Sequence, residues 1–216
     1  MSRRSYNHES YKGEKITNLL PEFVRSNWEF ERQELINDNY SVSHFDGEAI
    51  KPEGNIMVLY PNGSYSECYT SPVQSMWPVL TVGHTYYIRW LSRKEKTESG
   101  NYRNDGITED VYWPLYENGI LKGLNSSHYL LFRKNSHIFT LQQSQWPNIT
   151  VQDGPQKIRF DCNNQRKYVH YFLLADFMLI DLTATYTERG LELPTLSDLT
   201  GRPYFFGTIN LGDWHY

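Results

Sequence analysis

The residues that could carry chemistry include one compact group of carboxylates, Asp105, Glu109 and Asp110. Two carboxylates held about 5 to 10 Å apart can hydrolyse a glycosidic bond, and carboxylate oxygens also bind calcium. However, Asn104-Asp105-Gly106 is itself a turn signal. The sequence therefore favours a solvated turn over a glycoside hydrolase or lyase site. It predicts no cofactor, with a structural calcium left open because no set of ligands can be named.

Three Trp-Pro pairs form a second group: Trp77-Pro78, Trp113-Pro114 and Trp146-Pro147. Proline ends a strand or forces extended geometry on the preceding residue, which places these indoles near strand ends. Indole faces stack well on sugar rings, so Trp113 with Tyr116, or Trp146, are candidate carbohydrate-binding residues. The simpler interpretation, which we favour, is that the indoles cap the core or lie in a subunit interface.

No sequence motif for catalysis or for a metal site accompanies these residues. The chain has no Gly-x-Ser-x-Gly, no phosphate-binding glycine loop and no His-Glu-x-x-His. Cys68 and Cys162 are too far apart for a zinc knuckle and suit two buried thiols better than a disulfide. His128 and His137 could meet on neighbouring strands, but such histidines are more often packed or solvated. The sequence predicts a protein without enzymatic activity.

The composition limits the partners. The chain has 216 residues and a net charge of −4, so there is no basic surplus for nucleic acid. No stretch approaches the length of a membrane span. The polar N-terminus has no apolar signal region, which predicts synthesis in a cytoplasm without secretion. The high aromatic content of 15% suits strands and interfaces.

The elements that must position these residues are predicted to be strands. Residues 84–92 alternate strictly, with Tyr86, Ile88 and Trp90 on one face and Tyr87, Arg89 and Leu91 on the other. Residues 156–161 alternate too, with Ile158 and Phe160 inward and Lys157 and Arg159 outward. Further strands are expected at 40–45, 55–60, 65–70, 110–116, 127–133, 137–142, 168–175 and 177–182. A helix over 28–36 and a short turn at 196–199 complete the pattern.

Short strands separated by Gly, Asn, Asp and Pro indicate an antiparallel, jelly-roll-like β-sandwich. Asn62-Gly63 lies between two strand-like runs and predicts a hairpin. Residues 1–16 are polar and non-periodic, which predicts an extended or disordered N-terminal arm. Residues 17–216 are expected to form one β-sandwich domain.

The C-terminal stretch carries a resemblance. Phe177-Met178-Leu179-Ile180-Asp181-Leu182-Thr183 is followed by Gly190, Glu192, Pro194-Thr195 and Phe205-Phe206-Gly207-Thr208-Ile209. This pattern resembles a segment of many bacteriophage tail-associated and minor structural proteins, although the loop at 190–195 is longer than the usual Gly-Asn-Glu-Pro-Thr. Gly83-His84-Thr85-Tyr86-Tyr87-Ile88-Arg89-Trp90, with Asn18-Leu19-Leu20 and Trp28, resembles jelly rolls of the carbohydrate-binding-module type.

The segment has a structural interpretation. Met178, Ile180 and Leu182 should face the core, while Asp181 accepts hydrogen bonds from backbone amides of the next loop. Pro194 should stop the strand and stiffen the loop. Phe205 and Phe206 should hold the tail against the body of the domain.

The resemblance implies a non-enzymatic structural component of a bacteriophage virion, in the tail, baseplate or fibre region or on the capsid exterior. Such a protein would be assembled in the bacterial host cytoplasm and would contact other virion proteins and copies of itself. It could contribute to host-surface attachment through a surface glycan, and the arm 1–16 would be an anchor. The alternative is a carbohydrate-binding module that recognises a cell-surface polysaccharide.

Overall fold

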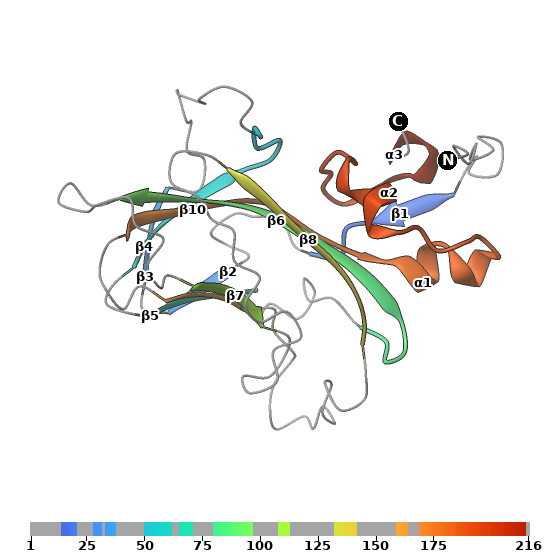
Figure 1. Ribbon diagram of the computed structural model, residues 1–216, viewed down its shortest axis with the longest axis horizontal. Helices are drawn as coiled ribbons and strands as arrows, with labels where there is room; N and C mark the ends of the chain where they lie inside the picture. The colour runs from blue at the N-terminus through green and yellow to red at the C-terminus, as the bar shows by residue number, and fades with distance from the viewer. Residues whose placement is uncertain are drawn as a thin grey trace.

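The computed structural model describes residues 14–20, 28–31, 33–37, 50–61, 65–70, 80–96, 108–112, 132–141, 159–163 and 169–214. These residues form two larger β-sheets that lie face to face, with a small two-stranded sheet beside them (Figure 1). All strand pairs in these ranges are antiparallel, so the predicted all-β sandwich is confirmed. No helix in the described part is long and apolar enough to cross a membrane.

The strand order is that of a jelly roll. The five-stranded sheet has the order β3 (Gln33–Asn37), β4 (Ile56–Pro61), β10 (Val169–Asp181), β6 (Thr85–Lys96), β8 (Arg133–Thr140). The four-stranded sheet has the order β2 (Trp28–Glu31), β5 (Tyr65–Thr70), β9 (Arg159–Asn163), β7 (Thr108–Tyr112). From β4 to β10 each described strand lies in the opposite sheet from the one before, as the interleaved Greek keys of a jelly roll require.

Two sequence predictions at the start of the sandwich are wrong. The predicted helix over 28–36 is two strands, β2 and β3, which carry the chain from the four-stranded to the five-stranded sheet. Trp28-Glu29-Phe30-Glu31 alternates with period 2, and this signal outweighs the apolar pair Phe30 and Leu35 on which the helix prediction rests. The predicted hairpin at Asn62-Gly63 also fails, because β4 and β5 pair within different sheets.

The long strands β6 and β10 are buried on both faces. Tyr86, Ile88 and Trp90 are at most 1% exposed, and so are Tyr87, Arg89 and Leu91 on the opposite face. The predicted strands at 168–175 and 177–182 are one strand, β10, interrupted by a register shift between Ala175 and Met178. The five-stranded sheet is therefore covered on two sides, and we call the side away from the four-stranded sheet its outer face.

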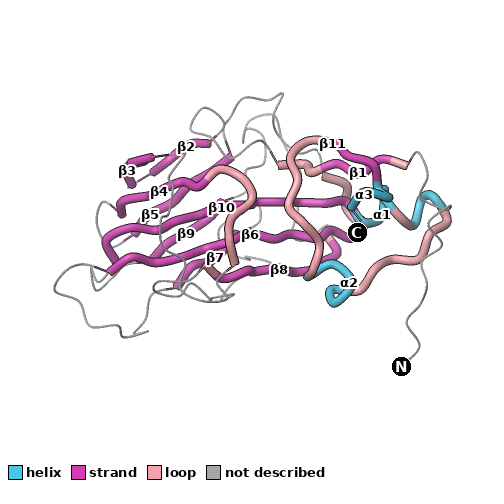
Figure 2. Tube along the Cα trace, turned by 90° about the horizontal axis from the view of Figure 1, so that it is seen from above, coloured by secondary structure: helices cyan, strands magenta, loops and turns pink. Residues whose placement is uncertain are grey.

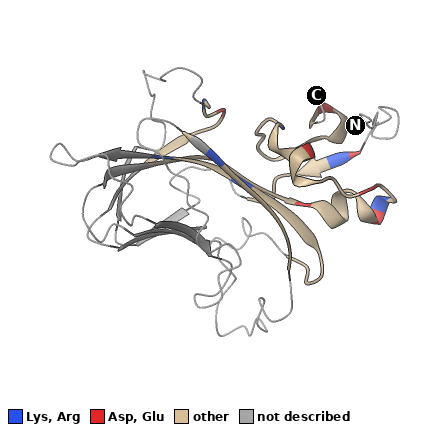
Figure 3. Cartoon of the chain, viewed as in Figure 1, with Lys and Arg blue, Asp and Glu red and all other residues tan. Residues whose placement is uncertain are grey.

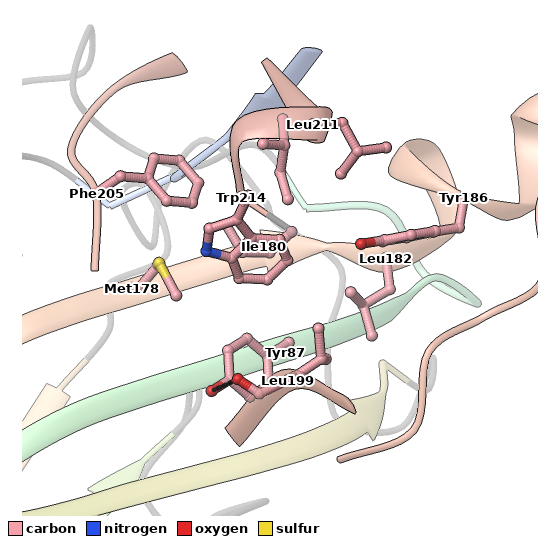
Figure 4. Close-up of a cluster of buried hydrophobic side chains, with 10 residues drawn as sticks. Tyr87, Met178, Ile180, Leu182, Tyr186, Leu199, Phe205, Leu211 and Trp214 are labelled. Carbon is pink, nitrogen blue, oxygen red and sulfur yellow. Dashed lines mark hydrogen bonds between the residues drawn. The ribbon is translucent and has the colours of Figure 1, made fainter. Parts of the chain in front are cut away.

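A C-terminal cap covers part of the outer face (Figures 1 and 2). It consists of α1 (Leu182–Thr185), the 3-10 turn η5 (Thr187–Arg189), α2 (Leu196–Thr200), β11 (Thr208–Asn210) and α3 (Leu211–Trp214), with β1 (Lys15–Thr17) paired to β11. Figure 4 shows Trp214 at the centre of its core, beside Phe205, Ile180 and Tyr87. Lys15 and Ile16, at the end of the predicted arm, thus belong to a strand, while residues 1–13 lie outside the described residues.

The structure of the cap agrees in part with the interpretation of the C-terminal segment. Met178, Ile180 and Leu182 are fully buried, and the Asp181 carboxylate accepts a hydrogen bond from Ala184 N at 2.9 Å, as predicted. The expected turn near 196–199 is α2. Pro194 does not stop the strand, because β10 already ends at Asp181, which caps α1. Phe205 is buried, but Phe206 is 52% exposed, so the predicted aromatic clamp has Trp214 as its second ring.

Candidate functional site

The register of the four-stranded sheet sorts its residues onto two faces. Residues directly opposite each other share a face, and faces alternate along each strand. One cross-strand row is apolar: Phe30, Cys68, Phe160, Val111. In a sandwich the apolar faces of the two sheets meet. We expect this row to form the inner face of the sheet, and the sequence likewise predicts that Phe160 faces inward.

The other face of the four-stranded sheet carries two polar rows. The first consists of Glu29, Tyr69, Arg159 and Tyr112. The second consists of Glu31, Glu67, Asp161 and Asp110. Alternation assigns both rows to the same face of the sheet, and we call them the Tyr row and the acidic row. Together they make the polar face of the four-stranded sheet.

The acidic row contains one residue of the predicted carboxylate group, Asp110. Glu109 and Asp110 are consecutive in β7, so they belong to opposite faces of the sheet. Asp110 is paired instead with Asp161 of β9, which is paired with Glu67 of β5. Asp105 lies outside the described residues. Within the described part, no group of three or more His, Cys, Asp or Glu side chains is placed to hold a metal ion.

The predicted carbohydrate-binding residues Trp113, Tyr116 and Trp146 lie outside the described residues, but the ends of their connections are described. Tyr112 and Tyr69 are both paired with Arg159, so β5 and β7 end where β9 begins. Trp113 directly follows Tyr112, and the connection that contains Trp146 leads into Arg159. Trp113 is therefore the next residue in the chain after the Tyr row, and the connection that contains Trp146 leads into that row.

The five-stranded sheet ends on the same side. Thr85 of β6 is paired with Thr140 of β8, and Tyr86 is paired with Asp181 at the end of β10. The connection from β5 to β6, which contains Trp77-Pro78, starts and finishes at this end of the sandwich. All three Trp-Pro pairs thus belong to connections that begin or finish at one end, which we call the Trp-Pro end.

A hydrogen-bonded polar cluster lies at this end of the five-stranded sheet. Asp181 Oδ2 is 2.8 Å from His84 Nδ1, and His84 Nε2 is 3.5 Å from Glu188 Oε1. The cluster ties α1 and η5 to the start of β6. Because both nitrogens of His84 face carboxylates, the three side chains are arranged to hold these elements together. Sequence reasoning found Asp181 through the turn chemistry but missed its partner His84.

Tyr86, beside this cluster, has a strongly shifted titration. Burial raises its pKa to about 12, and the nearby Asp181 carboxylate adds to the shift, while hydrogen bonds at Thr81 oppose it. Its hydroxyl accepts a hydrogen bond from Thr81 N at 2.8 Å. The ring stacks on Phe139 with centroids 5.7 Å apart. Tyr86 is thus a core residue whose hydroxyl fixes the turn that precedes β6.

Comparisons with known proteins concern overall shape alone. No protein-family model matches the sequence, and a search of curated proteins found no match. The fold is similar to the CBM22-1 xylan-binding domain of Xyn10C from Paenibacillus barcinonensis, with a TM-score of 0.41 and 8% identity over 77% of this chain and 92% of that one. The family 11 carbohydrate-binding module of Lic26A-Cel5E from Clostridium thermocellum gives 0.39 and 15%, over 78% and 95%. The enzymatically active domain of tailspike protein 4 from bacteriophage CBA120 gives 0.40 and 10%, over 73% of this chain and 20% of that one.

Proposed function

We propose that this chain is a non-enzymatic glycan-binding module that recognises a cell-surface polysaccharide. The observation that carries the proposal is the polar face of the four-stranded sheet. Its Tyr row places Tyr69 and Tyr112 on either side of Arg159, next to the acidic row. Aromatic rings offer a flat apolar surface to a sugar ring, while carboxylates and a guanidinium bind hydroxyl groups as acceptors and donors.

We propose that residues of the connections at the Trp-Pro end add to this surface. Trp113 continues the chain from Tyr112, and the connection with Trp146 leads into Arg159. Trp113, Tyr116 and Trp146 remain our predicted carbohydrate-binding residues, now as an extension of the Tyr row. Aromatic groups at a strand end beside an aromatic row suit an extended ligand, such as a polysaccharide chain, better than a single sugar.

The charge of the polar face limits the classes of polysaccharide that it can bind. Five carboxylates and one guanidinium leave four negative charges in excess on the Tyr row and the acidic row. Such a face repels uronic acids, sulfated sugars and phosphate-bearing wall polymers. The proposed ligand is therefore a neutral polysaccharide or one with amino sugars.

Glycan arrays and affinity electrophoresis on host wall polysaccharides test the proposal. Tyr112→Ala, Trp113→Ala and Trp146→Ala should each weaken binding about tenfold, since an aromatic contact of ~1.4 kcal/mol corresponds to that factor. Phe206→Ala is the matched control, because this exposed ring lies on the cap, away from the polar face. Binding that is unchanged in all three variants, or no binding to any neutral or amino-sugar polysaccharide, would remove the proposal.

A second candidate function is favoured by the C-terminal segment, which resembles one from bacteriophage structural proteins. We propose that the module works in a virion, where it contacts other virion proteins and copies of itself and aids host attachment. The short strand β1 is held by β11 and by an ion pair of 2.6 Å between Glu14 and Arg189. Residues 1–13 precede it and are the proposed anchor. Their deletion should reduce incorporation into particles, and normal incorporation would contradict the anchoring role.

A further inference from the structure

A buried carboxylate interrupts the longest strand. Asp176 lies at the register shift of β10, and its φ of 53° is in the left-handed region. Its side chain is 0% exposed. A non-glycine residue in this conformation costs on the order of 1–3 kcal/mol and persists only where its surroundings fix it. The contacts of the carboxylate show what these surroundings are.

The Asp176 carboxylate fastens a loop to the outer face. It accepts hydrogen bonds from Gly54 N at 2.8 Å and from Glu53 N at 3.1 and 3.2 Å. Gly54 is also pressed against the C-terminal segment, since a Cβ added there would lie 2.7 Å from Tyr204 Cε1. Residues 50–55 are thus held between the sheet and the segment 200–205.

Arg89 of β6 connects the two covering segments. Its Nη1 donates to Arg202 O at 2.6 Å. Its Nη2 lies 3.6 Å from Asp176 Oδ2 and 3.6 Å from Glu53 Oε1. Glu53 Oε1 in turn accepts a hydrogen bond from Tyr204 N at 3.1 Å. Figure 2 shows two loop segments that cross over β10 and β6.

The Arg89 guanidinium therefore lies at equal distances from two carboxylates, those of Asp176 and Glu53. The Arg89 side chain is 1% exposed, whereas the Glu53 side chain is 48% exposed. Among the described residues, Lys134 of β8 is a second basic group that interacts with Asp176, and its Nζ donates to Thr200 O at 2.9 Å. Figure 3 shows blue segments in the middle of the five-stranded sheet and a red one in the loop above it. The buried member, Asp176, carries the larger desolvation cost when it is charged.

We propose that Asp176, Arg89 and Glu53 form a proton-sensitive clasp that holds residues 50–55 and 200–205 on the outer face, more tightly when Asp176 is protonated. Opening the loop would give the Asp176 carboxylate access to water and relieve the cost of a buried charge. A protonated Asp176 keeps an oxygen that accepts from Gly54 N, and Arg89 keeps Glu53 as its partner.

The direction of the pKa shift of Asp176 supports this proposal. Burial raises its pKa above the usual 3.8, and the Glu53 carboxylate adds to this, while the Gly54 and Glu53 amides and Arg89 oppose it. The closed clasp thus binds a proton more tightly than the open one. Its stabilisation is complete below the ordinary pKa and is lost as the pH rises through the raised value.

Hydrogen–deuterium exchange between pH 4 and pH 8, corrected for the intrinsic rate, tests the clasp in the full chain. Protection of the amides of Glu53, Gly54, Arg202, Tyr204 and Phe205 should fall as the pH rises, by up to tenfold for each unit of pKa difference between closed and open states. Asp176→Asn, which is neutral at every pH, should keep these amides protected and remove the pH dependence. Protection that is flat or rises with pH in the natural sequence would overturn the proposal.

Two further variants keep the test informative if Asp176→Asn does not fold. Glu53→Gln removes the second negative charge but keeps the backbone donor, so the loss of protection should move to lower pH. Asp181→Asn is the matched control, because this carboxylate lies on the same strand but accepts from Ala184 N and does not contact Arg89. A pH dependence unchanged in Glu53→Gln, or abolished in Asp181→Asn, would contradict the assignment to the clasp.

Discussion

The acidic row makes a prediction about stability that does not depend on any ligand. Asp161 is paired with Glu67 on one side and with Asp110 on the other. Directly opposite residues of antiparallel strands lie about 5 Å apart, and like charges at such positions are destabilising. Replacing the central carboxylate by an amide removes both repulsions and leaves the shape of the side chain unchanged. Asp161→Asn should therefore stabilise the protein.

The magnitude follows from Coulomb's law. Two unit charges about 5 Å apart repel by about 0.8 kcal/mol in water, which agrees with the 0.2–1 kcal/mol attributed to cross-strand pairs. Two pairs give about 0.4–2 kcal/mol at low salt. At 1 M salt the screening length is about 3 Å, so most of this gain should disappear.

Urea unfolding at low and at high salt measures the effect of Asp161→Asn. Glu29→Gln is the matched control, because Glu29 belongs to the same face of the same sheet but is paired with Tyr69. A destabilised Asp161→Asn, a gain equal to that of Glu29→Gln, or a gain insensitive to salt would refute the assignment of the three carboxylates to one row.

Two other predictions concern the five-stranded sheet and its covering segments. Gly54→Ala should cost about 1–3 kcal/mol of unfolding free energy, because its Cβ would meet Tyr204. Gly201→Ala is the control and should be neutral or slightly stabilising, because the space around Gly201 is open. Equal urea midpoints for the two variants would contradict the close contact at Gly54. Tyr86 should ionise at about pH 12, so its contribution to stability is complete below pH 10.0 and is lost as the pH rises through 12. The absorbance titration of Tyr86→Phe should lack one phenolate signal near pH 12 that the natural sequence shows. If the signal missing from the variant instead lies near pH 10, the ring is not buried.

The sequence predicted the sandwich because its strongest strand signals are local. The alternation at residues 84–92 and at 156–161 reflects the pleat of one strand, and both lie at or within observed strands. Partner choice is not local. Asn62-Gly63 is a good turn signal, yet nothing within a few residues shows that β4 pairs with β10, more than one hundred positions away. The same limit hid the acidic row, whose members become neighbours only through the register.

The sequence could not predict the burial of Arg89, for a different reason. Its alternation partners Tyr87 and Leu91 predicted a face of the strand, but a charged residue in that pattern usually signals solvent. The observed burial depends on Asp176, Glu53 and the carbonyl of Arg202, which come from three distant segments. A buried charge needs such partners, and single-residue patterns do not contain them.

The two sheets therefore differ in how their residues are used. Residues 86–93 of β6 and 173–180 of β10 are buried, and part of them packs against the core of the cap. A sheet covered on both sides offers little surface to a ligand. The register of the four-stranded sheet instead aligns one apolar row and two polar rows, and the carboxylates of the acidic row are expected to repel one another. A like-charge row costs stability, and a sheet that carries one is better explained by binding than by packing. If Asp161→Asn raises stability while weakening glycan binding, both effects arise from the same row.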